Sequence, residues 1–151
     1  MSIHCVRLTF GIFAIAGVAM AAGCGSSSPT TPSSTTPPPT STGPTFSTQI
    51  QAQILTPACV PCHTDDGRTP SAGMILKSGV AYSSLVNVAS NGKPGAIRVI
   101  PGNPSGSYLV QKLEGAADIV GLRMPRNGPP FLTDAQVALI RLWIQNGAPN
   151  N

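Results

Sequence analysis

A run of residues that cannot form a hydrophobic core divides this chain into two unequal parts. All 21 positions from Gly25 to Thr45 are Gly, Ser, Thr or Pro. Such a segment buries almost no apolar surface and its prolines favour extended backbone, so it is expected to be a tether spanning at most roughly 65 Å. A compact domain must therefore lie in 46–151, which is a suitable length for one small domain.

The residues before the tether have the pattern of an export signal. Arg7 is followed by an uncharged apolar run from Leu8 to Ala22, and small residues then lead to Cys24. This run is shorter than the roughly 20 residues that a transmembrane helix needs, which favours a cleaved signal peptide at 1–23 over a retained anchor. The ending resembles that of bacterial lipoprotein signals, which implies lipidation of Cys24 and a tether over 24–45. Simple secretion is the alternative.

Composition and charge exclude several other classes of protein. Charged residues are 9% of the chain and hydrophobic residues 41%, which is not the balance of a disordered protein. The net charge is +4, but the basic residues are scattered, so we expect no interaction with nucleic acid. The acidic residues show no paired pattern that would indicate hydrolysis.

The cysteines of the folded part form a single motif. Cys5 lies in the signal peptide and Cys24 precedes the tether, which leaves Cys59 and Cys62 in the sequence CVPCH at 59–63. C-x-x-C-H is the pattern of covalent c-type haem attachment. Two thiols at this spacing can reach the two haem vinyl groups from one face of a turn, and His63 can then present its imidazole to the iron.

Two other uses of this motif fit the sequence less well. A structural zinc site needs four ligands. Once the signal peptide is removed and Cys24 is lipidated, only three Cys or His side chains are left to bind zinc: Cys59, Cys62 and His63. A thioredoxin-like dithiol requires a strand-helix-strand setting, which a chain with 16 Gly and 16 Pro does not favour. Haem attachment also agrees with export, because it is expected outside the cytoplasm.

The second axial ligand of such a haem is restricted by the absence of another histidine. His63 is the single histidine after the signal peptide, so a methionine thioether is the expected partner. Met74 lies close to His63 in an apolar stretch, where a core position is favoured. Met124 lies in an irregular loop of Pro and Gly that can pass over the opposite haem face. We favour Met124, with an open sixth position as the alternative.

The apolar spacing predicts short helices and little or no sheet. The last helix has the clearest boundaries, since Thr133 and Gln136 form a capping box, Leu132 and Val137 form a hydrophobic staple, and Gly147 ends it. Its expected buried face consists of Val137, Ile140, Trp143 and Ile144. The other predicted helices cover Ser47–Leu55, ending before Pro57, Val80–Val86 and Ser105–Leu113, and Ala96–Ile100 is expected to be extended.

Together these motifs resemble a known family. The C-x-x-C-H motif near the start, Met124-Pro125 in a late loop and a terminal helix are similar to the small class I cytochrome c fold. The resemblance is closest to the single-haem cytochrome c-like domains of planctomycete and other bacterial exported proteins, and it covers Ile50–Ala148. It implies an all-α fold of about four short helices around one covalent haem c, with His63 as proximal ligand and Met124 as distal ligand.

The resemblance also implies a function. We expect a monohaem c-type cytochrome at 46–151 that carries one electron in the bacterial cell envelope, and that is not an enzyme. It would be a monomer, anchored by lipid in the periplasm or at the cell surface, and would meet redox partner proteins. Arg123 and Arg126 flank Met124 and are candidates to steer an acidic partner; the alternative is that they are solvated loop charges. The alternatives are a haem enzyme or ligand sensor with an open sixth position, and a docking module in which haem stabilises the fold.

Overall fold

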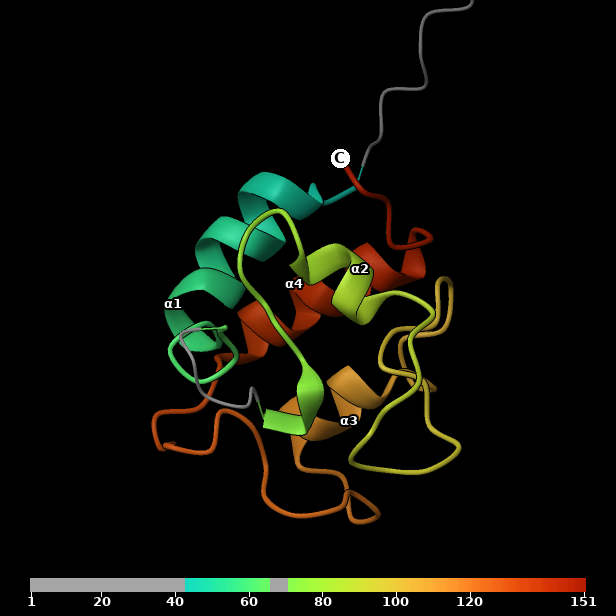
Figure 1. Cartoon of the computed structure of the whole chain (residues 1–151). Helices are drawn as coiled ribbons and strands as arrows, with labels where there is room; N and C mark the ends of the chain where they lie inside the picture. The colour runs from blue at the N-terminus through green and yellow to red at the C-terminus, as the bar shows by residue number, and fades with distance from the viewer. Residues whose placement is uncertain (1–42, 66–70) are drawn as a thin grey trace, which may run out of the picture. The chain divides into compact units, whose positions relative to one another are not determined.

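The structure, a computed structural model, describes residues 43–65 and 71–151, so the predicted signal peptide, Cys24 and nearly all of the tether lie outside the described residues. The described part is helical and contains no strand, which confirms the predicted all-α class for this part (Figure 1). In chain order it comprises the π-helix η1 (Phe46–Leu55), α1 (Thr56–Ala58), the short 3-10 helix η2 (Ser71–Gly73), α2 (Ala81–Leu85), α3 (Tyr108–Glu114) and α4 (Asp134–Gln145).

The first helix buries the face that its sequence predicts. Phe46, Ile50 and Ile54 are at most 5% exposed. At its N-terminal end the backbone N–H groups of Phe46 and Ser47 donate to the side chain and the backbone carbonyl of Asn151, at 2.8 and 2.9 Å. The last residue of the chain therefore satisfies N–H groups that a helix start leaves without intrahelical partners.

The first helix ends at Leu55, as predicted, but the helical backbone does not stop before Pro57. The chain continues directly from η1 into α1, and Pro57 lies in the first turn of α1. Because proline has no N–H, the bond to the preceding turn is missing at this position while the helical backbone continues. The helical backbone thus leads to Cys59, whose N–H donates to the carbonyl of Leu55 at 2.9 Å.

Helix α4 forms the centre of the hydrophobic core and contacts both η1 and α3 (Figure 1). Its four buried residues are the four that the sequence predicts, and the predicted capping box between Thr133 and Gln136 is present. The Trp143 ring lies 5.2 Å from that of Phe46 and 6.5 Å from that of Tyr82, measured between centroids. Aromatic rings from three separate helices therefore meet at α4.

The third predicted helix begins later than expected. Helix α3 begins at Tyr108 instead of Ser105, because residues 101–106 form turns. The hydroxyl of Ser107 donates to the carbonyl of Asn103 at 2.8 Å and accepts the N–H of Ile100 at 2.9 Å. The serine that precedes the helix therefore stabilises the preceding turn and forms no side-chain cap on α3.

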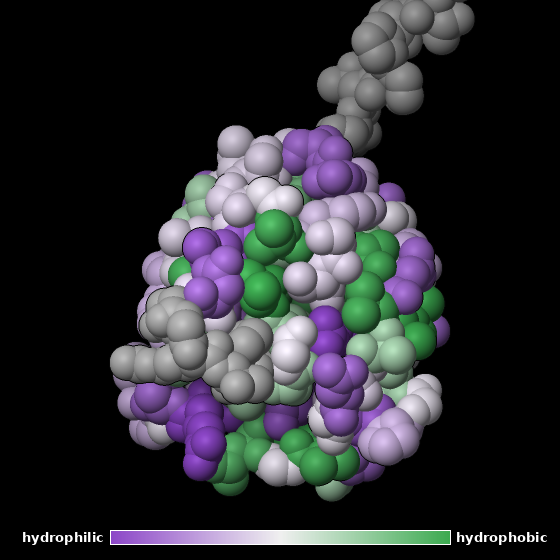
Figure 2. Space-filling view, viewed as in Figure 1, coloured by the Kyte–Doolittle hydropathy of each residue, from purple (hydrophilic) through white to green (hydrophobic). Residues whose placement is uncertain are grey.

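The segment Ala96–Ile100, predicted to be extended, has a bend at Arg98 and joins no sheet among the described residues. It forms isolated bridges that pair Val99 with Val86 and Ile97 with Ala89. On the face shown in Figure 2, hydrophobic residues lie in separate groups among polar ones. Within 43–65 and 71–151, no helix is long and apolar enough to cross a membrane.

Candidate functional site

The C-x-x-C-H motif forms a tight turn at the end of the first helical segment. The N–H groups of Cys62 and His63 both donate to the carbonyl of Cys59, at 3.1 and 2.9 Å. Cys59 is half-buried, Cys62 is exposed, and both are free thiols. Burial, with a smaller contribution from Cys62, raises the pKa of the Cys59 thiol to about 11. Neither thiol is therefore used in a disulfide, and the Cys59 thiol is protonated at neutral pH.

The imidazole of His63 is held in a defined orientation. Its Nδ1 lies 3.1 Å from the carbonyl oxygen of Met74, and the carbonyl of His63 accepts the N–H of Leu76 at 2.8 Å. Because a carbonyl only accepts, Nδ1 is the protonated nitrogen of the neutral ring, and Nε2 carries the lone pair. This is the arrangement in which a backbone carbonyl orients a metal-binding histidine.

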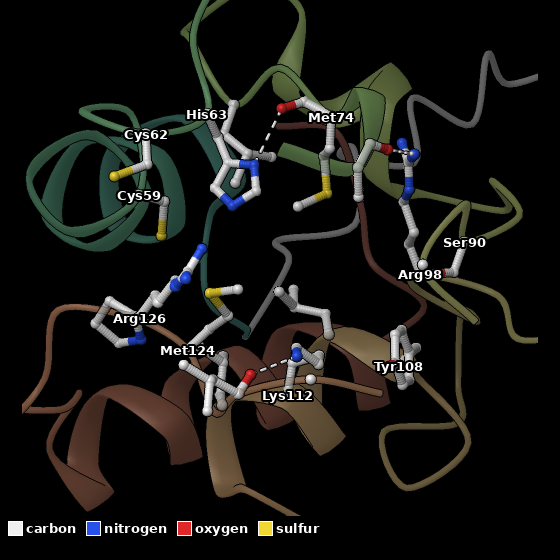
Figure 3. Close-up of a pocket in the computed structure, with 18 of the residues that line it drawn as sticks. Cys59, Cys62, His63, Met74, Ser90, Arg98, Tyr108, Lys112, Met124 and Arg126 are labelled. Carbon is white, nitrogen blue, oxygen red and sulfur yellow. Dashed lines mark hydrogen bonds between the residues drawn. The ribbon is translucent and has the colours of Figure 1, made fainter. Parts of the chain in front are cut away.

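All four residues predicted to hold the cofactor line a single cavity (Figure 3). Cys59, Cys62 and His63 lie along one side, and Met124 faces His63 from the other. The cavity has a volume of about 590 Å³, within the usual range for cofactor sites. Its wall is mainly apolar and includes Leu76, Leu85, Leu109 and Leu113.

The two candidate methionines both reach this cavity. Met74 is half-buried and packs against the hydrophobic core, as its sequence context predicts, but it also lines the cavity beside His63. Met124 packs against the same core from the other side of the cavity. The side chain of Met74 lies on the same side of the cavity as His63, whose imidazole contacts the Met74 carbonyl. The arrangement therefore favours Met124 as the group that faces the imidazole.

The two arginines beside Met124 differ in their surroundings. Arg123 donates through Nε to the carbonyl of Leu113 at 2.7 Å, and its guanidinium lies 4.2 Å from the centroid of the Phe131 ring. Arg126 is exposed and lines the cavity. Arg123 and Arg126 were both predicted to contact a redox partner. Of the two, Arg126 is the one that is exposed beside the cavity.

Two further basic residues at the cavity are absent from the sequence predictions. Arg98 is 7% exposed, and its guanidinium donates to the carbonyls of Ser84 and Ala72 at 2.7 and 3.1 Å. Burial lowers its pKa, and burial also lowers that of Lys112. Arg98 could have been identified from the sequence, because a charged residue inside the apolar segment Ala96–Ile100 indicates a buried, hydrogen-bonded arginine. No comparable sequence signal identifies Lys112.

The described residues that line the cavity include cations but no carboxylate. Arg98, Lys112 and Arg126 all line it, whereas the described ion pairs join other lysines and arginines to acids. The site is therefore electropositive, which favours the approach of an acidic surface.

One ion pair near the cavity leads to a prediction about how the stability of the fold depends on pH. The side chain of Lys93 donates to Asp118 at 2.7 Å, and this hydrogen bond holds the pKa of the Asp118 carboxyl below its ordinary value. Because the folded pKa is lowered, the pair stabilises the fold above the ordinary carboxyl pKa, and its contribution is lost as the pH falls through the folded value. In Lys93→Met, NMR titration of Asp118 should move toward the ordinary value.

Asp65 provides the internal control for this titration. Its pKa is also lowered by a lysine hydrogen bond, in this case from Lys77. The Asp65 titration should therefore stay unchanged in Lys93→Met. An unchanged Asp118 titration in that variant would contradict the assigned cause.

The donor set at the cavity fits a covalently attached haem. Two thiols lie beside an imidazole oriented by a carbonyl, and a thioether faces that imidazole across an apolar space. Among residues 43–65 and 71–151, no group of three or more His, Cys, Asp or Glu side chains is placed to hold a metal ion directly. No family model, curated protein or solved structure matches the chain.

Proposed function

We propose that residues 46–151 form a monohaem c-type cytochrome domain that carries one electron. The observation that carries the proposal is the convergence of Cys59, Cys62, His63 and Met124 on one apolar cavity, although Met124 is far from the others in the sequence. In a chain that lacks a second histidine after its signal segment, these residues supply two attachment points and two axial ligands.

Each residue has a distinct role in this proposal. Cys59 and Cys62 attach the group through thioether bonds, His63 is the proximal ligand oriented by the Met74 carbonyl, and Met124 is the distal ligand. When bound, haem supplies a centre that accepts and returns one electron, at a potential that His and Met ligation raises. The apolar wall excludes water from both ligands, so that both can stay in place during the exchange.

We infer that the domain works in the bacterial cell envelope, tethered by a lipid on Cys24. The polar, proline-rich sequence of 25–45 would let it reach redox partners at some distance from the membrane surface. At the mouth of the cavity, Arg126 is exposed together with Val120 and Leu122. This combination suits brief contact with an acidic protein surface through which electrons pass.

The first test is whether haem stays attached after denaturation. The full chain, matured in a bacterium that attaches haem covalently, should keep its haem signal on a denaturing gel. Replacing both Cys59 and Cys62 by alanine should abolish this signal, and each single replacement should reduce it. The reduced spectrum of the wild type should be low-spin. A wild type that carries no covalent haem would contradict the proposal, and a high-spin one that binds carbon monoxide readily would favour a ligand sensor or haem enzyme.

A further inference from the structure

The segment that leads to Met124 is held mainly by one short helix. The hydroxyl oxygen of Tyr108 in α3 accepts the N–H of Val120 at 2.9 Å. The ammonium of Lys112, one turn further along α3, donates to the carbonyl of Val120 at 2.9 Å and also to that of Leu122. The N–H of Met124 then donates to the backbone carbonyl of Lys112 at 2.9 Å.

These hydrogen bonds matter because little apolar burial fixes the same segment. Residues 116–124 form no helix, and the side chains of Val120 and Leu122 are 55% and 60% exposed. A stretch with few buried contacts opens easily unless polar contacts hold it. Besides the packing of its own side chain against the core, Met124 is therefore positioned by the bonds that its neighbours form with α3.

We propose that Lys112 is the positioning residue for Met124. Its ammonium holds two carbonyls within the four residues before Met124, which fixes the direction in which the thioether enters the cavity. Lys112 thereby sets how firmly Met124 occupies the distal position. The inference rests on the proposed ligation by His63 and Met124. It gives Lys112 a role at this site that acts only through the position of Met124.

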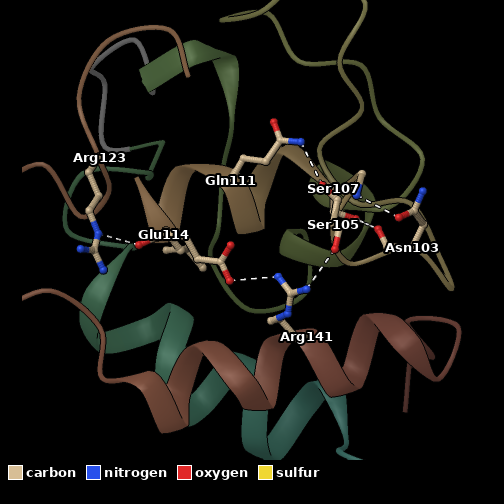
Figure 4. Close-up of polar contacts among 9 residues, drawn as sticks. Asn103, Ser105, Ser107, Gln111, Glu114, Arg123 and Arg141 are labelled. Atoms are coloured by element: carbon tan, nitrogen blue, oxygen red, sulfur yellow. Dashed lines mark hydrogen bonds and ion pairs between the residues drawn. The ribbon is translucent and has the colours of Figure 1, made fainter. Parts of the chain in front are cut away.

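Other side chains also hold this region. Arg123, adjacent to Met124, donates to the carbonyl of Leu113 near the C-terminal end of α3, and Arg141 separately bridges Glu114 and Ser105 (Figure 4). Lys93 also donates to this segment, but to the carbonyl of Asp118 at 3.1 Å, well before Met124. Lys93→Met is therefore a matched control, because it removes the same kind of charge and a bond to the same segment.

The test is competition between Met124 and added imidazole in the ferric holoprotein. Lys112→Met keeps an unbranched, helix-forming side chain and the backbone carbonyl, but loses both bonds of the ammonium. It should bind imidazole about tenfold to a hundredfold more tightly than the wild type, since bonds from a charged donor are lost. Lys112→Arg, which keeps the charge and donors, and Lys93→Met should both stay close to the wild type.

A second readout keeps the inference separate from the proposed ligation. Amide hydrogen exchange at 120–124 should become faster in Lys112→Met and stay slow in Lys93→Met, whatever ligand the iron has. If the wild type shows Met124 ligation but Lys112→Met changes neither readout, the role of Lys112 is wrong and the proposed function stands. If the wild type shows no Met124 ligation, the proposed function fails, and unchanged exchange in Lys112→Met would overturn the positioning role as well. Should Lys112→Met not fold, Lys112→Gln, whose shorter amide cannot span both carbonyls, is compared in the same way.

Discussion

In the proposed cytochrome, replacing Met124 by alanine is expected to leave the haem attached but to open one of its axial positions. Met124 faces His63 across the cavity, and the attachment residues Cys59 and Cys62 are unaffected by the change. Loss of the thioether removes the ligand that stabilises the reduced iron. The ferric protein should lose the weak charge-transfer band from methionine to iron, and it should bind imidazole and cyanide readily.

The same variant should show a large drop in reduction potential. We expect a fall on the order of 0.1 V, a modest part of the roughly 0.8 V that axial ligation controls in haem proteins. A potentiometric titration followed by the optical spectrum measures this change.

Met74→Ala is the matched control for this experiment, since it removes the same side chain from the same cavity on the histidine side. Its backbone carbonyl, which accepts from His63, is retained. This control should keep the charge-transfer band and most of the potential. If Met74→Ala lost the band and Met124→Ala kept it, the two methionines would have to exchange their assigned roles.

The largest effect on stability is expected for Trp143→Ala. Trp143 is fully buried in α4, its ring packs against those of Phe46 and Tyr82, and its Nε1 donates to the carbonyl of Pro149 at 2.9 Å. Removing such a side chain costs about 3–5 kcal/mol, because apolar contacts are lost and a cavity is left. For a small domain this is a large part of the free energy of unfolding.

The adjacent residue supplies the control for that measurement. Leu142 belongs to the same helix but is 48% exposed, so Leu142→Ala should change the free energy of unfolding by no more than about 0.5 kcal/mol. Urea unfolding of the holoprotein, followed by circular dichroism, measures both variants under the same conditions. Equal losses in the two variants would show that Trp143 is not a centre of the core.

Local sequence signals predicted the helices well where caps and spacing were strong. The Thr133 capping box and the four buried residues of α4 followed from contacts between residues three or four positions apart, which any helix brings together. The start of α3 was misplaced because the Ser107 hydroxyl bonds to a preceding turn, and that turn depends on residues outside the helix. The π-helix η1 ends at Leu55, as predicted, but Pro57 was read as a helix stop, whereas it lies in the first turn of α1, which continues the helical backbone.

By itself, the sequence determined the chemistry available to this protein: a C-x-x-C-H motif, and a single histidine and two methionines after residue 23. The tertiary structure decided which of these groups share a cavity and from which side each enters it. It also placed the buried charge of Arg98 and the attachment of the Met124 segment to Lys112. The physical reason is distance along the chain. Caps and helix periodicity join near neighbours and can be read locally, whereas the approach of Met124 to His63 depends on how all the intervening segments pack.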